Sequence, residues 1–251
     1  MIGNDIVDLG DPDTQPGATH PRFDARVFTA TELEAIHTSP VPNRVRWLLW
    51  AAKESAFKAF RKHDPSLVFS PARLVVARCL HDESHPVATV HNDEGTSPLV
   101  IPAKAGIQAQ DPRPCLDAGV RRHDGSTARC FCAHGMVCHG RWRISFGAVE
   151  TEGAVHVIAQ TDTDGEVVIA ERAEVDAECP SVAVRRLAIA ALAPRLGVDP
   201  DELTIVRDGR VPRMWLRDRL APVDLSLSHH GRFVAFAALL CSRHSCWRGA
   251  R

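Results

Sequence analysis

The sequence contains no uninterrupted apolar run of about 18 residues, the length that a membrane-spanning helix needs. It begins with a strand-like segment, so we expect no basic and apolar leader. Positive charge is not in excess: 30 lysines and arginines face 31 acidic residues, for a formal net charge of -1. A chain without an excess of positive charge is a poor candidate for nucleic-acid binding. We therefore expect a cytoplasmic protein that associates with neither membranes nor nucleic acid.

The eight cysteines lack the spacing of a zinc-binding knuckle. Three of them lie with two histidines in the segment Cys130–His139, but the C-x-C spacing differs from the usual C-x₂-C. We expect reduced thiols, and a cysteine-rich loop that leads into a strand near Trp142. A Cys/His metal-binding regulatory protein stays open as an alternative.

The hydrophobic pattern predicts a mixed fold. With 251 residues, 45% of them hydrophobic, the chain can form one large domain or two halves. Helical periodicity predicts long helices over residues 43–62 and 181–196, the second bent or ended by Pro194. Capping-box spacing predicts a short helix that begins near Thr29 or Thr31. Strand patterns occur at residues 2–9, 72–80, 142–149, 155–160, 165–170, 203–206 and in the stretch 223–239.

Residues 97–126 show neither helical nor strand periodicity, and prolines and glycines interrupt them repeatedly. We predict that this segment is a disordered insertion without a catalytic role.

Three charged side chains near the N-terminus predict a metal and phosphate site. Asp5 lies among apolar residues of the first strand, where a carboxylate needs a cation or a donor. Glu54 and Lys58 lie four residues apart on one face of the first long helix. An isolated pair of this kind is usually a surface ion pair, and Asp5 alone is more often a turn residue. Together, two acids and a lysine suit phosphoryl chemistry.

The segment Ser226–His229 places serine and histidine at the end of a predicted strand. An acyl-transfer nucleophile is a poor interpretation, because the sequence has no G-x-S-x-G elbow and adjacent strand residues point to opposite faces. His229 alone would more often be a hydrogen-bonded structural histidine.

The motifs Gly3–Leu9, Trp50–Lys58 and Ser226–His229 together resemble the signatures of the 4′-phosphopantetheinyl transferase superfamily, in the order of holo-acyl-carrier-protein synthase. The chain is about twice as long as a synthase subunit. Residues from Val182 onward are similar to the N-terminal half of Sfp-type transferases, and residues 1–164 to their C-terminal half. The resemblance implies an α+β pseudo-dimer of two similar halves, residues 1–164 and 165–251. Each half would pack a small antiparallel sheet against a long helix, with the active site between them in a monomer.

The resemblance also implies which residues form the site. Asp5 and Glu54 would bind Mg²⁺, since Val7 occupies the position where Sfp-type enzymes have a further acid. Asp5, Glu54 and Lys58 would be catalytic. We interpret Asp8, three residues after Asp5, as structural. The residues implied to bind coenzyme A are Lys53, Arg185, Arg186, Arg210, Ser228 and His229. Which of the two adjacent arginines does so, and whether Lys53 contacts phosphate or only extends along its helix, stays open.

The implied activity is transfer of the 4′-phosphopantetheine group of coenzyme A to a serine of an apo acyl or peptidyl carrier protein, as in fatty acid biosynthesis, with release of adenosine 3′,5′-bisphosphate. The choice of carrier stays open. A catalytically drifted module that binds coenzyme A or a carrier protein is the alternative.

Overall fold

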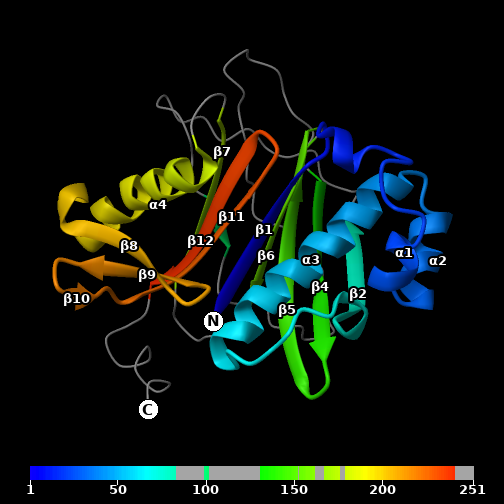
Figure 1. Ribbon diagram of the computed structural model, residues 1–251, viewed down its shortest axis with the longest axis horizontal. Helices are drawn as coiled ribbons and strands as arrows, with labels where there is room; N and C mark the ends of the chain where they lie inside the picture. The colour runs from blue at the N-terminus through cyan, green and yellow to red at the C-terminus, as the bar shows by residue number, and fades with distance from the viewer. Residues whose placement is uncertain (83–98, 102–130, 152, 162–166, 176–178, 241–251) are drawn as a thin grey trace.

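The structure is a computed structural model that describes residues 1–82, 99–101, 131–151, 153–161, 167–175 and 179–240 (Figure 1). The helices are α1 (Phe23–Val27), α2 (Ala30–Thr38), α3 (Pro42–His63) and α4 (Pro180–Leu196), with 3-10 helices η1 (Pro12–Thr14), η2 (Pro71–Arg73) and η3 (Pro200–Glu202). The strands are β1 (Ile2–Asp8), β2 (Val75–Asp82), β3 (Leu99–Ile101), β4 (Phe131–His139), β5 (Trp142–Glu150), β6 (Ala154–Gln160), β7 (Val167–Glu174), β8 (Leu203–Asp208), β9 (Val211–Leu216), β10 (Arg219–Leu220), β11 (Val223–His230) and β12 (Phe233–Leu240). In the described part of the chain, no helix is long and apolar enough to span a membrane.

These strands form three antiparallel sheets. The orders are β1-β6-β5-β4-β2, β11-β12-β7-β3 and β10-β9-β8. Few helices and antiparallel sheets agree with the predicted α+β class. The relation of the two halves as a pseudo-dimer, and the domain boundary at residue 165, stay predictions.

Helix α3 covers one face of the five-stranded sheet (Figure 1). Its buried side includes Leu48, Ala52 and Ala56, which pack on inward-facing residues of β1, β4, β5 and β6. Contact with β1 is close enough that a Cβ at Gly3 would lie 1.9 Å from the carbonyl oxygen of Ser55. Only glycine therefore permits this approach, which brings the Glu54 and Lys58 turns of α3 beside β1.

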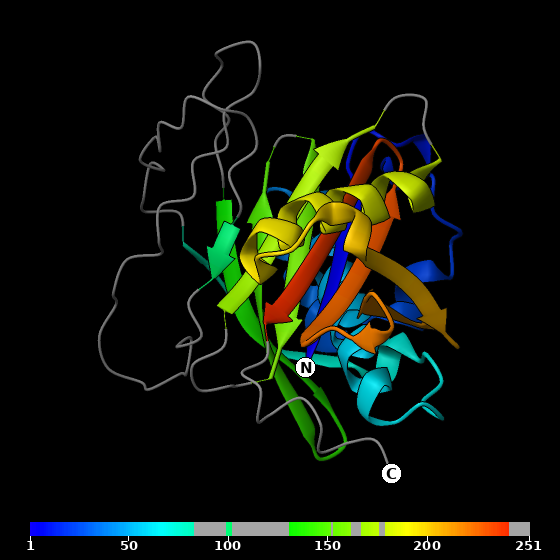
Figure 2. The ribbon, with the colours of Figure 1, turned by 90° about the vertical axis from the view of Figure 1, so that its left-hand side faces the viewer.

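Helix α4 lies across the four-stranded sheet (Figure 2). Its core contacts include Val184, Ala188 and Leu192 against β11 and β12. The opposite face of this sheet meets the five-stranded sheet through buried apolar residues: Ile2, Ile6, Ala154, Ile158, Ala170, Phe233, Ala235, Ala237 and Leu239. The order of layers is thus α3, five-stranded sheet, four-stranded sheet, α4.

Strands β1 and β11 lie side by side although they belong to different sheets (Figure 1). Side chains of β11 accept hydrogen bonds from amide groups of β1: Ile2 to Asp224 Oδ2 (2.9 Å), Asn4 to Ser226 Oγ (2.9 Å) and Asp8 to His230 Nδ1 (3.3 Å). We call this line of contact the seam. It joins the edges of the two sheets by side chains.

Most predicted elements are confirmed. The helices over 43–62 and 181–196 are α3 and α4, and the 142–160 hairpin is β5 and β6. Thr29 caps α2 with both bonds of the capping box to Glu32. Pro194 does not end α4, which continues to Leu196 and stops at Gly197 in the left-handed conformation.

The loop predicted for the cysteine-rich segment is wrong. Residues 131–139 form β4, which pairs with β2 and β5. Its residues alternate, with Ala133 and Val137 buried and His134 exposed. Among the described residues, no group of three or more histidine, cysteine, aspartate or glutamate side chains is placed to bind a metal ion. Cys130 lies outside the described residues.

The predicted insertion, residues 97–126, falls almost entirely outside the described residues. Within it, Leu99–Ile101 form β3, which pairs with β7. These three residues therefore contradict the prediction that the whole segment lacks structure.

Candidate active site

A cavity of about 500 Å³ lies between α3 and elements of the C-terminal part of the chain. One wall consists of residues from β1, α1 and α3: Asp5, Ile6, Phe23, Trp47, Trp50, Glu54 and Lys58. The facing wall consists of residues from α4, β8, β9, their connecting turn and β11: Ser181, Val184, Arg185, Arg207, Arg210, Pro212, Leu227, Ser228, His229 and His230. We call these the carboxylate wall and the cationic wall.

Asp5, Glu54 and Lys58 meet in the carboxylate wall. Lys58 Nζ donates to Asp5 Oδ1 at 2.7 Å and to the carbonyl oxygen of Asn4 at 3.0 Å. It also lies 3.8 Å from Glu54 Oε2. One ammonium group is therefore shared by two carboxylates, which leaves an excess of negative charge at this point of the cavity.

Burial raises the pKa of Glu54 to about 7, and the nearby negative charge of Asp5 adds to the effect, while Lys58 opposes it. A carboxylate with this pKa exchanges its proton near neutral pH, as a general base must. Because the charge of Asp5 contributes to this shift, a further cation beside the two carboxylates would favour the ionised form of Glu54.

The donor set fits a hard divalent cation. Mg²⁺ binds carboxylate and phosphate oxygens, and proteins usually supply only one or two of its ligands. Asp5 and Glu54 would provide these two carboxylates, and a second positive charge beside Lys58 would offset the excess of negative charge.

The cationic wall brings together groups that bind phosphate. Arg185 donates to the carbonyl and hydroxyl oxygens of Ser181, one turn earlier on α4, and this orients its side chain. Arg210 lies in the turn between β8 and β9. Burial lowers the pKa of His229, helped by the charge of Lys58, so this histidine is neutral at pH 7. Guanidinium groups and a neutral imidazole N–H are donors for phosphate oxygens.

A family comparison agrees with this geometry. Residues 1–101 match the family model of the 4′-phosphopantetheinyl transferase superfamily. The match covers less than half of the chain and supports a relation of its N-terminal part to this superfamily. The matched range contains Asp5, Glu54 and Lys58, whereas the cationic wall lies beyond it. No curated protein and no solved structure gives a significant match.

Two of the six residues implied to bind coenzyme A do not line the cavity. Arg186 is exposed and does not line the cavity, in contrast to its neighbour Arg185. Consecutive residues of a helix point about 100° apart, so the Arg186 side chain leaves α4 in a different direction from that of Arg185.

Lys53 is the second residue that does not line the cavity. Its side chain is fully buried, and Nζ donates to Glu32 Oε2 at 2.7 Å and to the carbonyl oxygens of Val27 and Pro71. Glu32 in turn accepts from the amide groups of Thr29 and Val76. Lys53 thus connects α3 to α2, α1 and η2, with no donor left for a phosphate.

Sequence reasoning missed Arg207 and the aromatic part of the carboxylate wall. Arg207 is three residues before Arg210, so the two flank the turn at Gly209, and this spacing around a hairpin turn was the available signal. Trp47 and Trp50 lie on the same stripe of α3 as Glu54 and Lys58, and Phe23 contacts both rings at 5.8 and 5.4 Å between centroids. The helical period could have indicated this stripe.

The raised pKa of Glu54 predicts a pH dependence of stability. Its ordinary value is 4.5 and its folded value about 7, so between these values the folded state binds more protons than the unfolded chain. The free energy of unfolding should therefore fall as pH rises through this window. Urea unfolding of metal-free protein from pH 5 to pH 8 measures it, and Glu54→Gln should flatten the profile. A wild-type profile with the same slope as the variant would contradict the assignment.

Proposed function

We propose that the protein transfers the 4′-phosphopantetheine group of coenzyme A to a serine of an apo carrier protein and releases adenosine 3′,5′-bisphosphate. The observation that carries the proposal is the cavity. Its carboxylate wall lies within the residues that match the superfamily, and it faces Arg185, Arg210 and His229. Coenzyme A carries phosphates that suit the cationic wall. Its pantetheine arm carries apolar groups that suit Trp47 and Trp50 in the other wall.

In the proposed reaction, the serine oxygen attacks the β-phosphorus of coenzyme A, and the bond from this phosphorus to the bridging oxygen breaks. Glu54 accepts the serine proton, directly or through water. Lys58 stabilises the negative charge that develops on the phosphate oxygens. A Mg²⁺ ion held by Asp5 and Glu54 would supply Lewis-acid polarisation of the pyrophosphate.

The direct test is mass spectrometry of several apo carrier proteins, each incubated with this protein, coenzyme A and Mg²⁺. A mass gain equal to one phosphopantetheine group supports the proposal and identifies the carrier class. Binding of coenzyme A without any mass gain would favour the drifted binding module instead.

His229→Ala and Arg185→Ala should raise KM for coenzyme A more than they lower kcat. Their side chains would bind phosphates remote from the reacting phosphorus, and remote binding energy need not change the chemical step. Kinetics with coenzyme A and with 3′-dephospho-coenzyme A measure this effect. Wild type should prefer coenzyme A, and the variants should hardly distinguish the two.

Arg186→Ala is the matched control, because it removes the same side chain one position away and outside the cavity. It should keep the wild-type preference. If His229→Ala and Arg185→Ala discriminate as strongly as wild type, neither residue binds the 3′-phosphate.

A further inference from the structure

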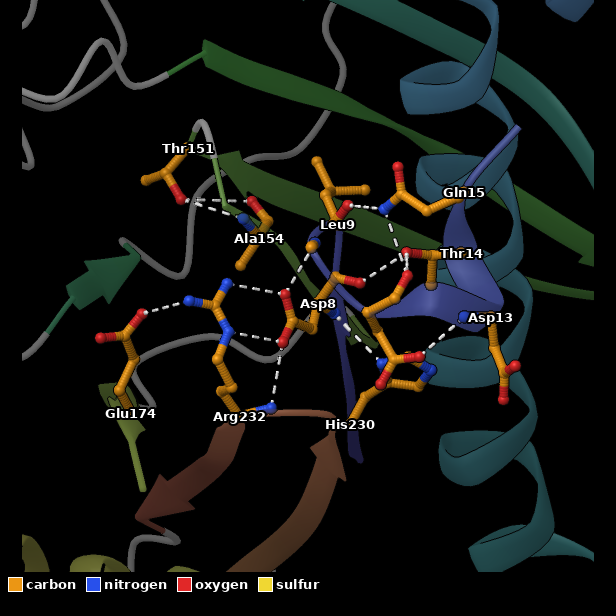
Figure 3. A network of polar contacts seen from close by, with 12 residues as sticks. Asp8, Leu9, Asp13, Thr14, Gln15, Thr151, Ala154, Glu174, His230 and Arg232 are labelled. Atoms are coloured by element: carbon orange, nitrogen blue, oxygen red, sulfur yellow. Dashed lines mark hydrogen bonds and ion pairs between the residues drawn. The ribbon is translucent and has the colours of Figure 1, made fainter. Parts of the chain in front are cut away.

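The carboxylate of Asp8, at the end of β1, is held by a dense set of hydrogen bonds (Figure 3). Oδ2 accepts from the amide and Nε of Arg232, both at 3.0 Å, and Oδ1 accepts from Nη2 of Arg232 at 3.0 Å and from the amide of Gly10 at 2.8 Å. The Asp8 side chain is 1% exposed. Burial alone would raise the pKa of Asp8, but the hydrogen bonds from Arg232 lower this pKa to about 2. Asp8 therefore stays charged at physiological pH.

Arg232 lies in the tight turn between β11 and β12. The preceding Gly231 has φ 52°, and a Cβ there would lie 2.5 Å from Asp8 Oδ2. The turn thus packs directly on the Asp8 carboxylate. Arg232 Nη1 also lies 3.7 Å from Glu174 Oε1 on β7 (Figure 3). The guanidinium group therefore connects the β11–β12 turn to both β1 and β7.

This contact lies at the cavity end of the seam. His229 and His230 immediately precede the turn and line the cationic wall, and Asp5 is three residues before Asp8. Because side chains join β1 to β11, the distance between the walls depends on such contacts. The Asp8–Arg232 pair makes three charge-assisted bonds across the seam, and such bonds are about twice as strong as neutral ones.

We propose that Asp8 and Arg232 are positioning residues, which hold His229 on β11 opposite Asp5 on β1 and so set the span between the two walls of the cavity. Neither residue of the pair lines the cavity. Its consequence for turnover rests on the proposed function, but its consequence for phosphate binding does not. A ligand that contacts both walls should depend on the pair, and a ligand held by one wall should not.

Calorimetric titration can separate these cases with Asp8→Asn, Arg232→Lys and the control Glu202→Gln, which alters the remote ion pair with Arg217. Inorganic pyrophosphate with Mg²⁺ probes both walls, and adenosine 3′,5′-bisphosphate without metal probes the cationic wall alone.

Asp8→Asn should weaken magnesium pyrophosphate binding by about tenfold or more, since small misplacements of binding groups cost this much. Arg232→Lys should show a smaller loss, because it keeps the charge without the paired donors. Binding of the adenosine bisphosphate should not change, and Glu202→Gln should match wild type.

The proposal is overturned if both ligands weaken equally, which indicates general loss of structure, or if pyrophosphate binding is unchanged, whatever the melting temperature. Should Asp8→Asn fail to fold, Arg232→Lys decides by the same comparison. Wild-type protein that binds magnesium pyrophosphate but modifies no carrier would refute the proposed function and leave the positioning role supported. Wild-type protein that binds no magnesium pyrophosphate would overturn the positioning role.

Discussion

Glu54→Gln should lower kcat for phosphopantetheine transfer by about 100-fold or more while the protein stays folded. The variant loses the candidate base and one charge of the proposed metal pair in a single substitution. The variant should still fold, because the Glu54 side chain is 26% exposed. Burial also disfavours the charged form of Glu54, so a neutral glutamine should be tolerated there. Carrier mass gain at saturating coenzyme A and Mg²⁺ measures kcat, and circular dichroism checks the fold.

Two companion variants sharpen this test. Glu34→Gln makes the same change on the exposed side of α2 and should behave as wild type. Asp5→Asn should also lose activity, but higher Mg²⁺ should restore part of it, because only one ligand has been removed. Wild-type turnover by Glu54→Gln would refute its role as base and metal ligand.

The sequence was sufficient for the charged residues of the carboxylate wall, because local periodicity determines their placement. The spacing of four residues places Glu54 and Lys58 on one helical face, and the motif glycine Gly3 precedes Asp5 on the strand that α3 approaches. In α3 and β1, the regular periods of helix and strand and the motifs around them were enough to predict that Asp5, Glu54 and Lys58 meet.

The remaining features depend on contacts between distant segments. Lys53 is adjacent to Glu54, but its environment is set by Glu32, and no local pattern reveals this partner. Arg207 reaches the cavity only through the pairing of β8 with β9. The alternation that marks strand β4 rests on small residues such as Ala133 and Gly135, which give a weak hydrophobic signal until the strand pairs with β2 and β5.

Lys53→Met should lower the free energy of unfolding by about 3 to 5 kcal/mol, the usual result of removing one partner of a buried ion pair. Burial lowers the pKa of Lys53, and Glu32 opposes that shift, so the pair exists in a poorly solvated environment. The variant leaves the Glu32 carboxylate buried without its cation and removes donors to Val27 and Pro71. Urea unfolding at pH 7 measures the loss.

The double variant Glu32→Gln with Lys53→Met tests whether the loss comes from the pair itself. Removing both charges should recover about 1 to 3 kcal/mol relative to the sum of the single variants, since contacting residues are coupled. Arg217→Met is the control at an exposed ion pair and should cost at most about 1 kcal/mol. Because Lys53 points away from the cavity, KM for coenzyme A should stay at the wild-type value in Lys53→Met at temperatures where it is folded. A raised KM with unchanged stability would return Lys53 to the list of phosphate ligands and would contradict the buried pair.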